Sequence, residues 1–364
     1  ESVAANLAAR YADLGEPLQA AMCFLAVSQG ALAVNALTRA HEAAIAYVIA
    51  DTLGQTKDPV DLKLLAFCAE REQRWQVAAD LLQQHPRGPT VLLPLLAARC
   101  PQKELSQSWS PWTPDQHRQA AQSALDDADF ATAVLNLVCC GDHAQAAEVG
   151  VTELFAMFQR SDWTIEQARD ILDSLEALPL QDMEVKHIAN ILASASYVGL
   201  VEARNLSYTS LIFPLAQTLR NIVTHQQLAF PVPMASITIL EASATAPSNP
   251  THALSQLTAL LNSPDLPPDL RPHVDQQIAA IQAQPPVDEG AAARSSGLGK
   301  MAGEHLPTCY RKFAKTSVLS NRLIKGPALE LEDQKFHVSL SDALAWVRVN
   351  VFSPLNTGCK IAPI

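Results

Sequence analysis

The feature that most constrains the fold of this 364-residue chain is a pair of small residues that recurs between two larger apolar ones. The unit occurs at residues 18–24, 75–82 and 130–137, where the central pairs are Ala20-Ala21, Ala78-Ala79 and Ala133-Val134. Small side chains on one face of a helix allow a second helix to approach closely. The pattern therefore predicts helices that pack in closely spaced pairs.

Glycine and proline interrupt these segments regularly and limit the expected helices to about 10 to 16 residues, an ordinary length for globular proteins. Residues 8–24 show the spacing small, aromatic, glycine, small, aromatic, which is typical of a helix–turn–helix pair. Such hairpins cannot bury their apolar faces alone and must stack on one another. A generic globular helix bundle is the alternative, but its helices would carry longer apolar stripes. The interruptions fall at Gly15, Gly30, Gly54, Pro59, Pro86, Pro94, Gly141 and Pro179.

Composition supports a helical class, because 48% of the residues are hydrophobic while only 5% are aromatic. We therefore expect an all-α fold: a TPR-like α-solenoid of stacked helical hairpins, with an extended C-terminal tail that contains a short helix. Four regions are expected. They are a TPR-like hairpin array (1–160), further helical hairpins (161–283), a flexible linker (284–299), and a basic arm with an apolar docking tail (300–364).

Longer helices are expected at residues 164–178, 183–199 and 207–223, the first of them opened by Asp162. In the tail, short strands at 328–331 and 336–339 should flank a polar turn at 332–334. Ser339 and Asp342 form a variant of the capping box, which predicts a short helix at 342–349.

The last residues, 350–364, are unusually apolar and predict a docking segment. Its expected anchors are Trp346, Phe352, Leu355 and Ile361. Docking on the chain's own last hairpins and docking on a neighbouring protein both remain open. A basic segment precedes the anchors and is expected to form either a helix or an extended arm; its residues are Arg311, Lys312, Lys315, Arg322 and Lys325.

Charge is unevenly distributed along the chain, whose formal net charge is −11. Residues 300–325 contain six basic side chains and one acidic side chain, so the preceding body is strongly acidic. Nucleic-acid binding by that body is not expected, because neutralising phosphates requires a basic face. The longest apolar runs are about half of the roughly 20 residues that span a bilayer, and no transmembrane segment is expected. The seven scattered cysteines are expected to be reduced.

The sequence contains no motif that is typical of a catalytic or metal-binding site. The chain has no CxxC, HExxH, GxSxG or calcium-loop pattern, so no catalytic residue, cofactor or metal site is expected. Asp170 and Asp173 are interpreted as carboxylates that keep a helix face soluble. Trp109 and Trp112, in a proline-broken polar loop, either fold back on the helices or form a contact surface. A deep pocket lined by converging polar groups would favour the rival hypothesis of a ligand-binding or enzymatic helical domain.

The segment LAARYADLGEPLQAAMCFLAVSQGALAVNAL and the ending SLSDALAWVRVNVFSPLNTGCKI carry a resemblance to known proteins. They resemble the helical arrays of intraflagellar-transport and related WD-repeat proteins, above all the C-terminal region of the WD-repeat-containing protein seventeen family. The resemblance is most specific over residues 4–54 and weaker over residues 70–150.

This resemblance implies a non-enzymatic scaffold in a cilium or flagellum, either on the axoneme or in a transport train. It also implies membership of a large complex and other ciliary proteins as partners, with microtubule association left open. Whether β-propellers precede Glu1, as they precede the helical array in that family, is left open as well. A cytoplasmic location is the alternative. A vesicle-coat scaffold of membrane trafficking, which uses the same architecture, is the alternative function.

Overall fold

The computed structural model is mostly helical, which confirms the all-α prediction. It describes residues 2–14, 16–39, 59–71, 73–110, 112–160, 162–206, 208–246, 250–263, 266–283, 316–321, 323–324 and 328–361. The predicted linker (284–299) lies outside these residues. So do all five residues of the basic arm: Arg311, Lys312, Lys315, Arg322 and Lys325.

The first part of the chain forms short helices. They are α1 (Ser2–Leu14), α2 (Pro17–Ala26), α3 (Gly30–Arg39), α5 (Pro59–Arg71), α6 (Trp75–Gln83), the π-helical η1 (Gly88–Leu92), α7 (Leu93–Arg99) and α8 (Lys103–Trp109). Next come α9 (Pro114–Asp126), α10 (Phe130–Cys140) and α11 (His143–Gln159).

The second part contains the longest described helix, α13 (Val185–Asn205). Around it lie α12 (Ile165–Leu175), the 3-10 helix η2 (Leu180–Asp182), α14 (Thr209–His225), α15 (Met234–Thr245), α16 (Pro250–Leu261) and α17 (Arg271–Gln282). The tail adds β1 (Ala328–Glu330), β2 (His337–Ser339) and α20 (Leu340–Val349). No helix among the described ranges is both long and apolar enough to cross a membrane.

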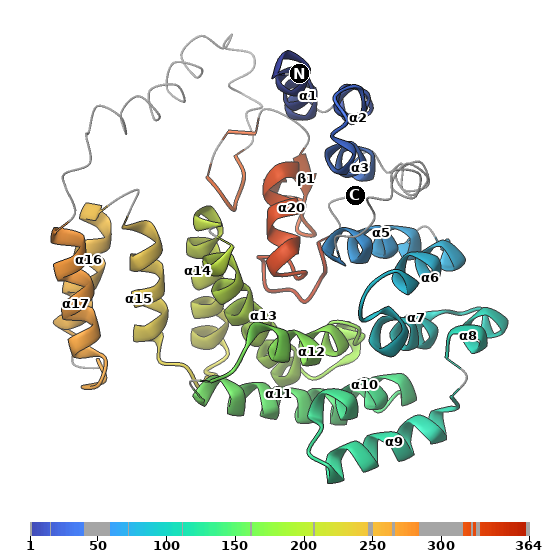
Figure 1. The fold of residues 1–364 in the computed structure, drawn as a ribbon. Coiled ribbons are helices and arrows are strands. Elements are labelled where there is room, and N and C mark those ends of the chain that lie inside the picture. The colour runs from blue at the N-terminus through green and yellow to red at the C-terminus, as the bar shows by residue number, and fades with distance from the viewer. Residues whose placement is uncertain are drawn as a thin grey trace.

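Helices that follow one another in sequence also pack on one another. Contacts join α1 to α2, α2 to α3, α5 to α6, α9 to α10, α13 to α14, and α14 through α15 and α16 to α17. Figure 1 shows these helices following a curved path, with α20 on its inner side. The tail, although last in sequence, therefore lies beside the helices from the middle of the chain.

The small pairs lie in the seams between helices, as the sequence predicts. Ala20, Ala78, Ala79 and Ala133 are fully buried, and Ala21 is 2% exposed. Because these side chains add little bulk, neighbouring helices approach closely along them. Gly15, the predicted turn residue, lies outside the described residues.

Local capping explains where several helices begin. The α9 helix starts at a full capping box between Thr113 and Gln116. The prediction that Asp162 opens the next long helix is wrong: α12 begins after Thr164, whose hydroxyl accepts from the N–H of Gln167 in a second capping box. The Gln167 side chain in turn accepts from the N–H of Thr164, so the pair satisfies two backbone N–H groups that the helix leaves free. This explains why the helix begins after Thr164 and not after Asp162.

The tail hairpin and its helix agree closely with the prediction. Strands β1 and β2 pair antiparallel, with Leu329 opposite Val338, around a turn at 332–335. The Ser339 hydroxyl accepts from the N–H of Asp342 and caps α20. The helix begins at Leu340, two residues before the predicted start. Before the hairpin, Thr316 and Leu323 form an isolated bridge, so the described part of 311–324 is not helical.

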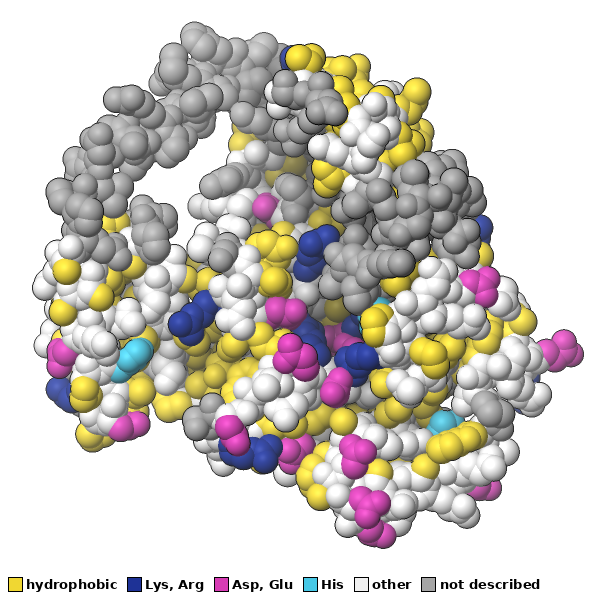
Figure 2. Space-filling model, viewed as in Figure 1, with side chains coloured by type: hydrophobic (Ala, Val, Ile, Leu, Met, Phe, Trp, Pro, Cys, Tyr) yellow, Lys and Arg dark blue, Asp and Glu magenta, His cyan; other side chains and the backbone are white. Residues whose placement is uncertain are grey.

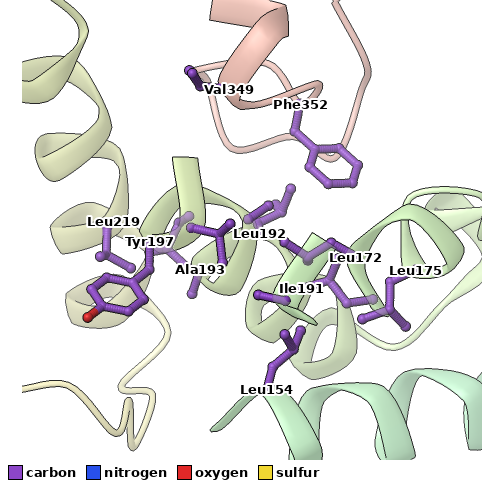
Figure 3. Packing of buried hydrophobic residues seen from close by; sticks show 14 of the residues in the cluster. Leu154, Leu172, Leu175, Ile191, Leu192, Ala193, Tyr197, Leu219, Val349 and Phe352 are labelled. Carbon is purple, nitrogen blue, oxygen red and sulfur yellow. The ribbon is translucent and has the colours of Figure 1, made fainter. Parts of the chain in front are cut away.

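Buried apolar residues form three clusters. One joins α2 to α8, another joins α7 and α9 to α14 with the tail, and the last joins α15 to α17. Figure 3 shows Phe352 of the tail pointing toward the helices that carry Leu172 and Leu192, and all three residues belong to the second cluster. The tail is thus part of the largest core and not an appendage.

The two loop tryptophans behave differently. Trp109 ends α8 and is buried in the first cluster. Trp112 remains 51% exposed, and its ring packs against His117 with centroids 5.3 Å apart.

Candidate functional site

A pocket with a volume of about 430 Å³ lies where the tail meets the helices. Its walls come from α5 and α6, from α7 and the turn before it, from α12 and α13, and from the tail on both sides of Val351. Figure 2 shows Lys, Arg, Asp and Glu side chains gathered near the centre of the face viewed there. This pocket was not predicted from the sequence. Charged side chains converge in it beside an apolar wall, and such convergence is what the rival hypothesis of a ligand-binding domain requires.

Helix α12 supplies the polar floor of the pocket. Arg169, Asp173 and Glu176, which follows directly after the helix, are spaced four and three residues apart. Residues with this spacing lie on one helix face, so three charged side chains point in similar directions. Asp173 and Glu176 are both buried. The interpretation of Asp173 as a surface carboxylate is therefore wrong, because Lys63 of α5 and Arg87 of the turn before η1 lie against it.

Asp173 accepts from two cations that come from distant parts of the chain. Lys63 Nζ lies 2.5 Å from its Oδ1, and Arg87 Nη1 lies 2.9 Å from its Oδ2. Arg87 also pairs with Asp170 at 2.7 Å. Burial alone raises the pKa of Asp173, but the charges of Lys63, Arg87 and Arg169 outweigh this effect and hold that pKa below its usual value. Asp173 is therefore a charged link between α5, the turn before η1 and α12.

Arg169 connects α12 to both α13 and the tail. Its Nη2 lies 2.5 Å from Glu202 Oε2 and 2.5 Å from the backbone oxygen of Val349, and its Nη1 lies 3.3 Å from Glu176. Burial lowers the pKa of Arg169, but Glu202 and Glu176 more than offset burial and raise it above its ordinary value. The bond to Val349 satisfies a free carbonyl at the end of α20, where a cation also complements the helix dipole.

Lys360 and Arg99 form the opposite side of the pocket. Arg99 at the end of α7 binds both carboxylate oxygens of Glu70, at 2.6 and 2.8 Å. Lys360 lies on a short backbone pairing in which Ile361 N–H donates to Val351 O at 2.9 Å and Ser353 N–H donates to Cys359 O at 2.8 Å. Burial, together with the positive charges of Arg99 and Lys63, lowers the pKa of Lys360 to about 8. Lys360 keeps exposed surface, so solvent moderates this effect.

The predicted tail anchors lie in the core of the same chain. Trp346 is fully buried, Phe352 is 1% exposed and Ile361 is 5% exposed, while Leu355 is partly buried against the same cluster. The Trp346 indole N–H donates to the backbone oxygen of Phe352 at 2.7 Å, which closes the turn after α20. In this structure the apolar segment docks within its own chain. It packs on α12 and α13, however, and not on the last hairpins that the intramolecular alternative named.

The sequence analysis missed Lys63, Arg87, Arg169 and Lys360 as members of a site. The one available signal was the run Arg169-Asp170-x-x-Asp173-x-x-Glu176, a dense charged stripe at helical spacing. Its partners lie between 33 and 180 residues away along the chain and could not be identified from this run.

The pocket's chemistry is that of paired charges next to an apolar wall, which suits binding. Within the part of the chain that the structure describes, no group of three or more His, Cys, Asp or Glu side chains is placed to hold a metal ion.

Fold and site together define a mostly helical protein whose C-terminal tail closes a charged pocket against its own helices. A scan of protein-family models found no match, and a search of the solved structures found none.

Proposed function

We propose that this chain is a non-enzymatic α-solenoid scaffold that assembles ciliary or flagellar machinery by binding partner proteins. Sequential packing of short helices along a curved path supports the solenoid, since such stacking presents a long continuous surface. The buried small pairs support it as well, because those of α2, α6 and α10 lie in helices that pack on their neighbours in sequence.

The observation that carries the binding role is an exposed apolar surface on the first helices. On α1, Val3, Leu7 and Leu14 are 79%, 42% and 60% exposed. On α2, Leu18 and Met22 are 46% and 70% exposed. Figure 2 shows apolar side chains over this region. Contiguous apolar surface of this kind marks an interaction site in soluble proteins.

The spacing of these residues indicates what binds there. Val3, Leu7 and Leu14 lie four and seven residues apart, so they form one stripe along α1, and Leu18 and Met22 form a second stripe on α2. Two parallel apolar stripes accept an amphipathic helix or helical hairpin, which would continue the packing of α1, α2 and α3. We therefore assign the surface to a helical segment of a partner protein.

The ciliary assignment depends on the sequence resemblance alone. This resemblance makes other ciliary proteins the expected partners, either on the axoneme or in a transport train. A vesicle-coat scaffold is the alternative function. Imaging of the tagged protein distinguishes them. Signal along the cilium or flagellum is expected, and signal confined to Golgi vesicles would replace the ciliary assignment with the coat.

Cross-linking mass spectrometry on isolated cilia tests the binding surface. The wild-type protein is expected to cross-link to partner proteins through α1 and α2, and Met22→Glu combined with Leu18→Glu should remove these cross-links. Val185→Glu is the matched control, because Val185 is 64% exposed but lies at the start of α13. Equal cross-linking by the double variant and the control would contradict the proposal.

A further inference from the structure

The pocket between the tail and the helices has an excess of positive charge. Its wall contains six Lys or Arg side chains and four Asp or Glu side chains. Burial and the charge of Lys63 lower the pKa of His85, so this ring adds no positive charge near neutral pH. Each acid already lies within 4 Å of a cation: Glu70 pairs with Arg99, Asp173 with Lys63 and Arg87, and Glu176 and Glu202 with Arg169.

Four of the six cations take part in these pairs, and Lys360 is not among those four. It forms no ion pair with any other residue that the structure describes. Lys63 and Glu70 from α5, Arg99 from α7 and Glu176 after α12 all act on its ammonium, and Arg348 of α20 lines the same pocket. Burial and the two nearby cations outweigh the two acids and lower the pKa of Lys360 to about 8. Such a position favours an incoming anion, which would neutralise the excess charge.

The rest of the wall is apolar. Phe67, Leu95, Val347, Val351 and Ile361 line the pocket together with smaller side chains. A volume of about 430 Å³ is larger than a phosphate or sulfate ion needs and falls within the range of pockets that hold small organic molecules. The occupant therefore needs an apolar body as well as a negative group.

We propose that this pocket binds a small organic anion with an apolar body, whose acidic group lies between Lys360 and Arg99. The apolar part packs against Leu95, Val351 and Ile361. Because Lys360 and Ile361 belong to the tail while Arg99 and Leu95 belong to α7, the bound molecule bridges the two and holds the tail in place. This inference concerns a different surface from the apolar stripes of α1 and α2, and it stands whether or not the ciliary assignment holds.

Isothermal titration calorimetry and thermal melting with sodium octanoate test the proposal on the whole 364-residue chain. Octanoate supplies a carboxylate on a seven-carbon apolar chain, 1-octanol supplies an apolar chain of similar length without the charge, and inorganic phosphate supplies the charge alone. We expect saturable octanoate binding that raises the melting temperature. Both reference compounds should bind more weakly, because 1-octanol can contact only the apolar part of the wall and phosphate can contact only its cations.

Lys360→Met should weaken octanoate binding about tenfold or more, the effect of losing a hydrogen bond to a charged group. Lys335→Met is the matched control, because Lys335 is an exposed lysine of the tail hairpin outside the pocket wall. Binding to the wild type should also weaken by most of the same factor between pH 7 and pH 9.5, because Lys360, with a pKa of about 8, loses its proton over this range. No octanoate binding, equal binding of 1-octanol, or equal binding by Lys360→Met would overturn the proposal.

A second measurement needs no variant. Competitive labelling with an amine-reactive acylating reagent, read by mass spectrometry, follows Lys360 in the wild-type chain. Octanoate is expected to protect Lys360 from the reagent and to leave Lys335 unprotected. Equal labelling of Lys360 with and without octanoate would overturn the proposed anion site. The cross-linking experiment on α1 and α2 tests only the scaffold proposal, so the two proposals can fail separately.

Discussion

Arg169 shows how one side chain holds several elements together. It is 16% exposed and reaches Glu202 on α13, Glu176 after α12 and the last carbonyl of α20. Its loss would leave two carboxylates and a helix-end oxygen without this donor. A buried or nearly buried charge that loses its partner costs more than the original pair contributed, because desolvation is no longer compensated.

Arg169→Met is therefore expected to lower the free energy of unfolding by about 3 to 5 kcal/mol. Urea unfolding followed by circular dichroism measures this change. Arg160→Met serves as the control, because Arg160 is 55% exposed and its pair with Glu153 at 2.8 Å should contribute about 0 to 1 kcal/mol. Equal effects of the two substitutions would contradict a central role for Arg169.

Asp173 makes stability depend on pH in a defined direction. Its folded pKa lies below the ordinary value of 3.8, because the charges of Lys63, Arg87 and Arg169 overcome the effect of burial. The stabilisation it provides is thus fully present above about pH 4 and is lost as the pH falls through the lower folded pKa.

We expect the unfolding free energy of the wild type to fall between pH 5 and pH 2, and Asp173→Asn to flatten this decline while lowering stability at pH 7. Urea titrations at several pH values measure both effects. The control is Asp269→Asn, in an exposed turn before α17, which should keep the wild-type slope. An unchanged acid slope in Asp173→Asn would show that other groups control the transition.

At the scale of elements, the contact between α13 and α20 determines where the tail lies. Gly199 stands in the middle of α13, where sequence analysis expected the helix to end. A Cβ atom at Gly199 would lie 2.6 Å from the backbone oxygen of Val349, so only glycine permits this approach. Asn350 then donates to Ser196 at 3.4 Å, one turn earlier on α13.

Gly199→Ala should push α20 away from α13 and destabilise the protein by about 1 to 3 kcal/mol, the usual cost of overpacking. Hydrogen exchange read by mass spectrometry should show faster exchange in residues 346–361. Gly150→Ala is a suitable control, since its added methyl meets only the side chains of Leu175 and Ile171. Faster exchange of residues 346–361 in Gly150→Ala alone would show that the contact of Gly199 with Val349 does not hold the tail in place.

At the scale of the whole molecule, the tail closes the inner side of the curved helical path. Trp346, Val349, Phe352 and Ile361 belong to the same apolar cluster as α9 to α14, whereas most buried residues of α15 to α17 form a separate cluster. The tail hairpin also binds the terminal loop, where Thr357 donates to Glu332. Removing the tail should therefore affect the middle helices most.

Deletion of residues 340–364 is expected to lower the melting temperature strongly, because truncating even one buried aromatic side chain costs about 3 to 5 kcal/mol. Differential scanning calorimetry measures the loss, and Trp346→Ala should reproduce part of it. Phe336→Ala is the control, because Phe336 is 48% exposed on the tail hairpin. An unchanged melting profile after the deletion would show that the tail adds nothing to the fold.

The sequence by itself determined the local structure of this protein. Small pairs such as Ala78-Ala79 predicted the helix seams, the Ser339 cap predicted the start of α20 to within two residues, and the polar turn predicted the pairing of β1 with β2. Each of these depends on residues a few positions apart, which interact in almost any context that permits a helix or hairpin. The capping box at Thr164 was equally local and could have been found.

Tertiary structure alone decided the site. Lys63 and Asp173 are 110 residues apart, and Arg169 and Val349 are 180 residues apart, yet each pair is joined by a hydrogen bond of 2.5 Å. Spacing within α12 shows that Arg169 and Asp173 share a face, but not which partners cover that face. The curvature of the packed helices and the return of the tail bring these charges together, and both result from summed packing over the whole chain.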